Sequence, residues 1–293
     1  MLRNWKCAFG TSQIIEYVRE KGTGVTGAFY DMIKRKLISN EGMHMNRLYR
    51  KNELIFSIIW IVVYVVGLSL ADQLSASLGV EKLITVIACM IMTGILINWM
   101  KRNDLFKEYG LCKSQIEAKR LLYYIPLGFM ASINLWFGIS LNLSLLETIF
   151  YIISMLLVGF LEEIIFRGLL FKAMCKDNVK SAIIVSSVTF GIGHIVNLIN
   201  GSGADLCSNL LQVGYAIAGG FLFTILFYKT KSLVACIVTH GVLNALSVFA
   251  NEAARSSVLE IVSAVALAGI SILYAIYVLR INEDKNELEN KTI

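Results

Sequence analysis

Charge and proline are scarce in this chain of 293 residues. Charged residues make up 16% of it and there is one proline, Pro126, whereas hydrophobic residues make up 56%. A soluble domain typically has about 25% charged residues. The shortage of charge excludes a disordered chain, a coiled coil and a small disulfide-stapled secreted module. The composition instead predicts an all-α polytopic membrane protein.

Cysteine is present but forms no metal-binding or disulfide pattern. The close pairs of a zinc knuckle and the clustering of a disulfide framework are both missing from the six cysteines, Cys7, Cys89, Cys112, Cys175, Cys207 and Cys236. We interpret them as chemically inert. A net charge of +6 can indicate a nucleic-acid partner. Here the basic residues lie almost wholly between apolar segments, so we predict no nucleic-acid partner.

Apolar segments long enough to cross a bilayer, about 20 residues each, recur eight times. They cover approximately residues 54–71, 83–100, 121–142, 145–172, 181–199, 209–228, 232–250 and 257–279. Pro126 lies in the first turns of the third segment, where a helix tolerates proline. The short connections predict that consecutive helices run antiparallel.

The distribution of basic residues predicts the orientation in the membrane. With the N- and C-termini in the cytoplasm, the inner connections, the terminal segments and the inner end of the fourth helix hold 25 of the 27 Lys and Arg residues. Lys82 and Arg255 are the two that lie outside. This bias follows the positive-inside rule. A buried soluble helical core, the alternative, would not produce such an alternation.

Two polar segments flank a transmembrane domain predicted over residues 54–280. Residues 1–53 contain ten Lys or Arg, five Asp or Glu, and apolar residues partly at helical spacing. This pattern is typical of an amphipathic segment on anionic lipid or of a non-catalytic extension. In the second case the working protein begins near Met45. Residues 281–293 are predicted to form a charged cytoplasmic tail.

Charged and polar side chains inside the spans are the strongest functional signal, because they are costly in a bilayer and usually mark a site. The fourth span contains Glu162, Glu163 and Arg167. The fifth contains His194, and the seventh contains His240 and Asn244. The predicted depths of these residues place them in the cytosolic half of the membrane, around a cavity open to the cytosol.

Helical spacing predicts how these side chains are arranged. Glu163 and Arg167 are four residues apart and share a helix face, whereas the adjacent Glu162 points about 100° away and has no partner on its own helix. One carboxylate is then held ionised and the other is free to act as a base. The alternative for each group is structural: a buried ion pair for Glu163 with Arg167, and interhelical hydrogen bonds for His194 and Asn244.

Three motifs in order on separate spans resemble one known family. They are Glu162-Glu163-x-x-x-Arg167, Phe190-x-x-x-His194 and His240-x-x-x-Asn244. They match the E-E-x-x-x-R, F-x-x-x-H and H-x-x-x-N/D motifs of the CPBP family, which comprises CAAX proteases and bacteriocin-processing enzymes and is also called Abi or type II CAAX endopeptidases. The resemblance covers approximately residues 120–250, so the first two helices lie outside it.

The resemblance implies an eight-helix intramembrane endopeptidase of the cell membrane, with its site on the cytoplasmic side and no covalent intermediate. It implies that Glu162 is the general base and that His194 helps it to hold a water. His240 and Asn244 would stabilise the oxyanion. The pair of Glu163 and Arg167 would support the site. The implied partners are a peptide or lipidated protein substrate and the lipid bilayer.

Two questions stay open at the level of sequence. Glu162, His194 and His240 also form a one-carboxylate, two-histidine set that could bind zinc, so a metalloprotease is the alternative to a cofactor-free glutamate mechanism. The biological role implied by the resemblance is bacterial peptide maturation or bacteriocin self-immunity. A non-proteolytic membrane scaffold or immunity protein and a proton-coupled transporter are the competing classes of function.

Overall fold

The computed structural model describes residues 45–198, 205–251 and 256–281. The chain divides into two units, Met1–Lys51 and Asn52–Ile293. In the first unit the described residues, 45–51, are helical. The predictions for residues 1–44 and for the charged tail fall almost entirely outside the described residues. The account below concerns the second unit.

Six helices of the second unit are long and apolar enough to cross a membrane. They are α3 (Glu53–Ser77), α4 (Leu83–Arg102), the helix Leu145–Cys175, the helix Val179–Leu198, α9 (Leu206–Thr230) and α11 (Ser257–Arg280). Several begin at a side-chain cap. Asn52 accepts from Ile55 N, Ser144 and Glu147 form a capping box, and Ser256 accepts from Leu259 N.

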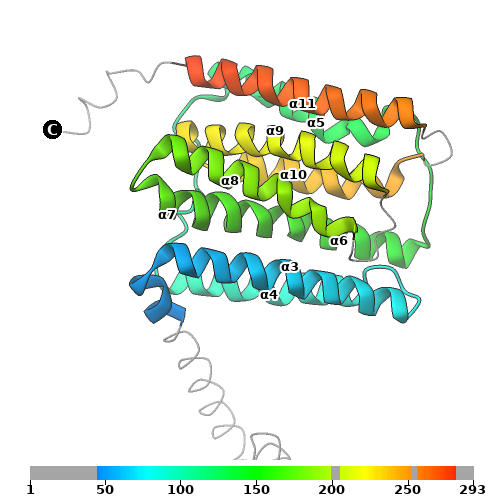
Figure 1. The fold of residues 1–293 in the computed structure, drawn as a ribbon, viewed down its shortest axis with the longest axis horizontal. Helices are drawn as coiled ribbons and strands as arrows, with labels where there is room; N and C mark the ends of the chain where they lie inside the picture. Colours follow the sequence, from blue (N-terminus) through cyan, green and yellow to red (C-terminus); the bar gives the residue numbers. More distant parts are fainter. Residues whose placement is uncertain (1–44, 199–204, 252–255, 282–293) are drawn as a thin grey trace, which may run out of the picture. The chain divides into compact units, whose positions relative to one another are not determined.

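The helices pack in layers (Figure 1). α3 and α4 lie along one side, α11 and the short α5 (Ile125–Ser132) along the opposite side, and α6 (Leu145–Glu162), α8 (Val179–Gly193), α9 and α10 (Val234–Leu246) lie between them. α6 contacts both α4 and α10, and α9 contacts both α8 and α11. The middle layer therefore holds the two helices that carry Glu162 and His240.

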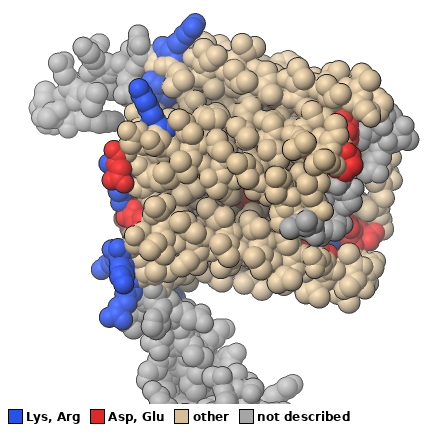
Figure 2. Space-filling model, viewed as in Figure 1, with Lys and Arg blue, Asp and Glu red and all other residues tan. Residues whose placement is uncertain are grey.

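The faces of the bundle match a bilayer. α3 buries a stripe of residues at helical spacing, while most of its remaining apolar side chains are exposed. On the face shown in Figure 2, a broad band with almost no charged atoms separates the two ends of the bundle. In the described residues an isolated bridge between Ile139 and Ala250 is the one β interaction. The prediction of an all-α polytopic membrane protein is confirmed.

The continuous third helix predicted over residues 121–142 is wrong. A 3₁₀ turn, η1 (Ala118–Tyr124), ends in residues with positive φ, at 52° for Tyr123 and 59° for Tyr124, and these interrupt the helix before α5 begins. A second turn, η2 (Ile133–Leu135), follows α5. Beyond it the chain does not continue as a helix. In that stretch Asn142 Nδ2 donates to the carbonyls of Val248 and Ala250.

The seventh predicted span is also shorter than expected. α10 and the turn η5 (Ser247–Phe249) form one apolar helix over Val234–Phe249. Asn134 Nδ2 donates to Leu243 O at 2.7 Å and ties the α5 segment to this helix. Six of the eight predicted spans are therefore long helices, two are short, and the count of eight remains a proposal.

Two glycines bring α6 and α10 together next to the polar motifs. A Cβ at Gly159 would lie 2.5 Å from Gly241 N and 2.6 Å from Gly241 Cα. The two backbones therefore approach more closely than any side chain at position 159 permits. Gly159 precedes Glu162 by three residues and Gly241 follows His240 directly. The crossing thus sets the distance between the two motifs.

At the opposite end from most basic residues, the connection between α3 and α4 is held by an ion pair. Lys82 Nζ lies 2.8 Å from Asp72 Oδ1. Burial disfavours the charged ammonium, but the ion pair with Asp72 outweighs burial and raises the pKa of Lys82 above its ordinary value. Lys82 is therefore charged at neutral pH, which explains how a lysine is accommodated at this otherwise acidic end.

Candidate active site

The first motif lies where the helix type changes. α6 ends at Glu162, and the next nine residues, η3 (Glu163–Phe171), form a π-helix before α7 (Lys172–Cys175) resumes the α form. π-Helical segments are rare and occur frequently at functional sites. The sequence predicted an ordinary α-helix here.

Glu163 and Arg167 form the ion pair that their spacing predicted. Arg167 Nη1 donates to Glu163 Oε1 at 3.1 Å, and both side chains are fully buried. The same Oε1 lies 2.8 Å from His240 Nδ1. One carboxylate oxygen therefore joins the arginine of η3 to the histidine of α10.

His240 lies between the two adjacent carboxylates. Its Nδ1 faces Glu163, and its Nε2 lies 3.2 Å from Glu162 Oε2. The Glu163 carboxylate is also paired with Arg167 within the same cluster. Such pairing is what burial requires, because an uncompensated charge away from water is costly.

Glu162 has a partner that the sequence did not reveal. Tyr64 OH, from the middle of α3, donates to Glu162 Oε1 at 2.7 Å. The prediction that Glu162 has no partner on its own helix is correct, and its partner comes instead from α3. Glu162 Oε2 is buried and has no hydrogen-bond partner among the described residues, since its contact with His240 lacks hydrogen-bond geometry. The available signal for Tyr64 was a hydroxyl in the centre of an apolar span.

Aromatic rings enclose the guanidinium. Arg167 Cζ lies 4.1 Å from the centroid of the Phe190 ring and 5.8 Å from that of Phe223. Arg167 Nε and Nη2 have no hydrogen-bond partner within the described part of the chain. The ring faces take the place of such partners through cation–π attraction, which is strongest where water is excluded.

Phe190 also connects the two motif histidines. Its ring meets the His194 ring edge-to-face at a centroid distance of 5.3 Å and the His240 ring at 5.6 Å. The phenylalanine of the second motif is thus a packing centre that touches the arginine and both histidines. This gives a physical reason for a phenylalanine four residues before His194.

His194 and Asn244 lie at the edge of this group. His194 is the first residue of the turn η4 (His194–Leu198) at the end of α8, is half-buried, and packs against Phe190. Asn244 follows His240 by one turn on α10 and is half-buried. In the described residues neither side chain makes a hydrogen bond within the group. The structure therefore joins Glu162, Glu163, Arg167 and His240 directly, with His194 adjacent through Phe190.

The zinc set considered from the sequence does not assemble. In the described ranges no group of three His, Cys, Asp or Glu side chains has the geometry to hold a metal ion. Glu162 Oε2 and His240 Nε2 lie close together, but the second nitrogen of His240 faces Glu163, and His194 does not complete a third ligand. The residues present therefore do not fit the three-ligand site that catalytic zinc requires.

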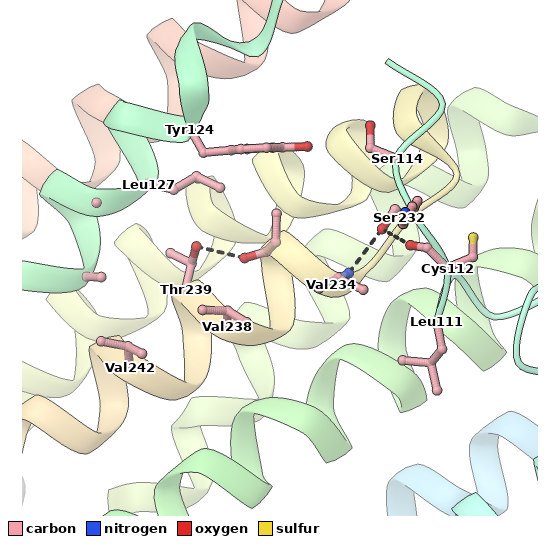
Figure 3. A pocket seen from close by; sticks show the side chains of 14 residues that line it. Leu111, Cys112, Ser114, Tyr124, Leu127, Ser232, Val234, Val238, Thr239 and Val242 are labelled. Atoms are coloured by element: carbon pink, nitrogen blue, oxygen red, sulfur yellow. Dashed lines mark hydrogen bonds between the residues drawn. The ribbon is translucent and has the colours of Figure 1, made fainter. Parts of the chain in front are cut away.

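A groove of about 750 Å³ lies on the other side of α10 (Figure 3). Its walls are mainly apolar, with Tyr124 and Leu127 facing Val238 and Val242. Thr239, next to His240, lines it, so α10 presents the groove on one face and the charged cluster on another. None of the six candidate site residues lines the groove.

The structure thus shows a bundle of apolar helices with a buried Glu–Glu–Arg–His cluster. Comparison with known proteins is more specific. Residues 144–246 match the family model described as type II CAAX prenyl endopeptidase Rce1-like. The chain is also 29% identical over 181 residues, 57% of its length and 69% of the relative's, to the "Putative membrane peptidase YdiL" of Bacillus subtilis (strain 168).

Both comparisons agree with the resemblance to the CPBP family that the three motifs predicted. The matched residues 144–246 contain all six candidate site residues. Tyr64 lies outside them. The comparisons point to a protease within a multi-pass membrane protein.

Proposed function

We propose that this protein is an intramembrane endopeptidase that hydrolyses peptide bonds in membrane-associated or lipidated peptides. The observation that carries the proposal is the buried cluster in which Glu162 Oε2, without a hydrogen-bond partner among the described residues, faces His240 Nε2 at 3.2 Å. An acceptor and a possible donor then stand side by side in a buried site. Such a pair suits the attack of water on a carbonyl.

In the proposed reaction Glu162 is the general base. Its Oε2 takes a proton from a water molecule as the water oxygen bonds to the scissile carbon. His194, at the edge of the cluster, orients this water. When the tetrahedral intermediate collapses, the C–N bond breaks and Glu162 returns the proton to the leaving amine.

His240 and Asn244 stabilise the negative charge that develops on the carbonyl oxygen of the substrate. A carbonyl oxygen beside His240 Nε2 would accept a hydrogen bond from an N–H at that atom, and the Asn244 amide lies one turn further along the same helix. Glu163 holds the opposite ring nitrogen at 2.8 Å and so fixes the ring orientation. Arg167 balances the charge of Glu163. In this account no residue forms a covalent intermediate.

The mechanism is proposed to need no metal cofactor, with a zinc metalloprotease as the alternative to be tested. Purified protein is treated exhaustively with a chelator, and its metal content and cleavage rate are measured. We expect cleavage to persist in metal-depleted protein. Stoichiometric zinc that is lost together with activity and restored with it would establish the metalloprotease instead.

The site is proposed to face the cytoplasm, with both termini and residues 1–53 on that side. For the second unit, Figure 2 supports this orientation, since Lys and Arg side chains gather at the end of the bundle where α3 begins and α11 ends. Basic residues follow α4, α7 and α9 at their ends, including Lys101, Arg102 and Lys231. Residues 1–53 are proposed to be a non-catalytic extension.

The biological role is proposed to be peptide maturation or self-immunity against bacteriocins. The family model that matches residues 144–246 is named for a prenyl endopeptidase, so a lipidated peptide is the first substrate to test. A scaffold or immunity partner without proteolysis and a proton-coupled transporter remain the competing functions. Each predicts a different outcome in the following experiment.

The test uses protein reconstituted in liposomes and a quenched fluorescent peptide ending in an S-farnesylated cysteine, with the unlipidated peptide beside it. We expect wild-type protein to cleave the lipidated peptide and Glu162→Gln to lose at least about 100-fold in kcat. Glu108→Gln, which alters a half-exposed carboxylate paired with Lys172 at 2.7 Å, is the matched control and should retain activity. Equal cleavage by wild type and Glu162→Gln would refute the mechanism, and proton-driven flux without cleavage would favour the transporter.

A further inference from the structure

Tyr64 brings α3 into contact with the reactive carboxylate. α3 buries one stripe against the bundle, and Tyr64 lies at its centre with 7% of its surface exposed. Its hydroxyl donates to Glu162 Oε1 at 2.7 Å across 98 positions of sequence. No motif and no matched family region includes this helix.

The hydroxyl of Tyr64 behaves differently from others on the same stripe. Ser57 and Ser75 donate to carbonyls of their own helix, Glu53 O and Ala71 O. A phenol is too long to do this and needs a partner on another element when it is buried. Tyr64 finds that partner in an ionisable group, not in a backbone carbonyl.

The bond distinguishes the two oxygens of Glu162. Oε1 is occupied by Tyr64, while Oε2 points to His240 Nε2 and has no hydrogen-bond partner in the described part of the chain. Without a donor at Oε1 the carboxylate could rotate, and either oxygen could turn toward His240. The phenol therefore decides which oxygen faces the place where substrate would react.

We infer that Tyr64 is a positioning residue for the reaction, which fixes the Glu162 carboxylate so that Oε2 acts as the base. This inference rests on the proposed function and adds to it a residue from outside the matched region. Tyr64 does not touch the substrate. It acts through Glu162, so its loss should slow the chemical step without weakening substrate binding.

The central test is Tyr64→Phe, which removes the hydroxyl and keeps the buried ring. We expect kcat to fall about 10- to 100-fold, the range for a lost hydrogen bond to a charged group, while KM changes less than about 2-fold. The matched control is Tyr274→Phe. Tyr274 is 3% exposed, and its hydroxyl donates to Leu121 O at the same distance of 2.7 Å. We expect this control to lose thermal stability comparably and to keep its kcat.

A second pair of variants separates the hydrogen bond from the packing of the ring. Tyr64→Gln and Tyr64→Leu both remove the ring, but glutamine retains an N–H donor. We expect Gln at position 64 to support a higher kcat than Leu. Equal kcat in this pair, or an unchanged kcat in Tyr64→Phe, would overturn the positioning role and leave Tyr64 as a packing residue.

The same assay distinguishes failure of this inference from failure of the proposed function. If wild type cleaves the farnesylated peptide, Glu162→Gln does not, and Tyr64→Phe matches wild type, only the inference about Tyr64 is refuted. If wild type does not cleave, or Glu162→Gln cleaves normally, the proposed base is wrong and the role of Tyr64 falls with it. In the Glu162→Gln background we expect Tyr64→Phe to have no further effect on the residual rate.

Discussion

Replacing Gly159 by alanine tests whether the α6–α10 crossing controls catalysis. The added Cβ would lie 2.5 Å from Gly241 N, whereas ordinary contact begins at 3.4 Å. The atoms in contact are backbone, so no side chain can move aside. The two helices must separate by the difference, about 0.9 Å.

Such a separation reaches the charged cluster directly. If α10 moves away as a rigid body, the distance from His240 Nδ1 to Glu163 Oε1 grows from 2.8 Å to at most about 3.7 Å. The distance from His240 Nε2 to Glu162 Oε2 grows from 3.2 Å to at most about 4.1 Å. A full shift takes the first pair beyond hydrogen-bond reach. A misplacement of about 1 Å can reduce the rate about 100-fold, and the overpacking should lower stability by about 1–3 kcal/mol.

The assay measures kcat on the farnesylated quenched peptide and the thermal unfolding midpoint in the same detergent. Gly219→Ala is the control, because a Cβ at this position of α9 meets nothing within 4 Å. We expect the control to keep its activity and to be as stable as wild type or more so, since alanine favours helix more than glycine does. A Gly159→Ala variant that folds and keeps more than half of the wild-type kcat would refute the argument from the helix crossing.

Three further predictions concern the cluster and the N-terminal unit. Arg167→Met leaves the buried Glu163 carboxylate without its arginine and should lower the free energy of unfolding by about 3–5 kcal/mol. The double variant Arg167→Met with Glu163→Gln should be more stable than Arg167→Met alone. A chemical unfolding titration in which the two variants are equally unstable would contradict the pairing. Phe190→Leu removes the ring above the guanidinium and should reduce kcat about 10-fold. The control Phe129→Leu changes a side chain that is 55% exposed and should keep its kcat. Equal kcat values for the two variants would refute the packing role of Phe190. Removal of residues 1–44 should leave kcat unchanged, because the whole cluster lies in the second unit; lost cleavage at equal protein amounts would make that segment part of the working protein.

The sequence predicted what depends on local spacing. Apolar runs define the long helices, and the spacing of four between Glu163 and Arg167 predicted their ion pair, because residues so spaced share a helix face whatever surrounds the helix. The presence of Glu162, His194 and His240 within three different spans also required only composition and length. Each of these features is determined by residues that are close together in the sequence.

The tertiary structure decided everything that joins distant parts of the chain. Tyr64 looks like any aromatic residue of an apolar span until α3 is packed beside η3, where it meets a carboxylate 98 positions away. The end of the segment 121–142 is tied to carbonyls more than 100 positions later by bonds from Asn142. The position of His240 between two adjacent glutamates depends on Gly159 and Gly241 allowing two backbones to touch. Periodicity shows which face of a helix is polar. Only packing selects the residues that this face contacts, because the free energy of those contacts depends on burial and distance in space and not on nearness in sequence.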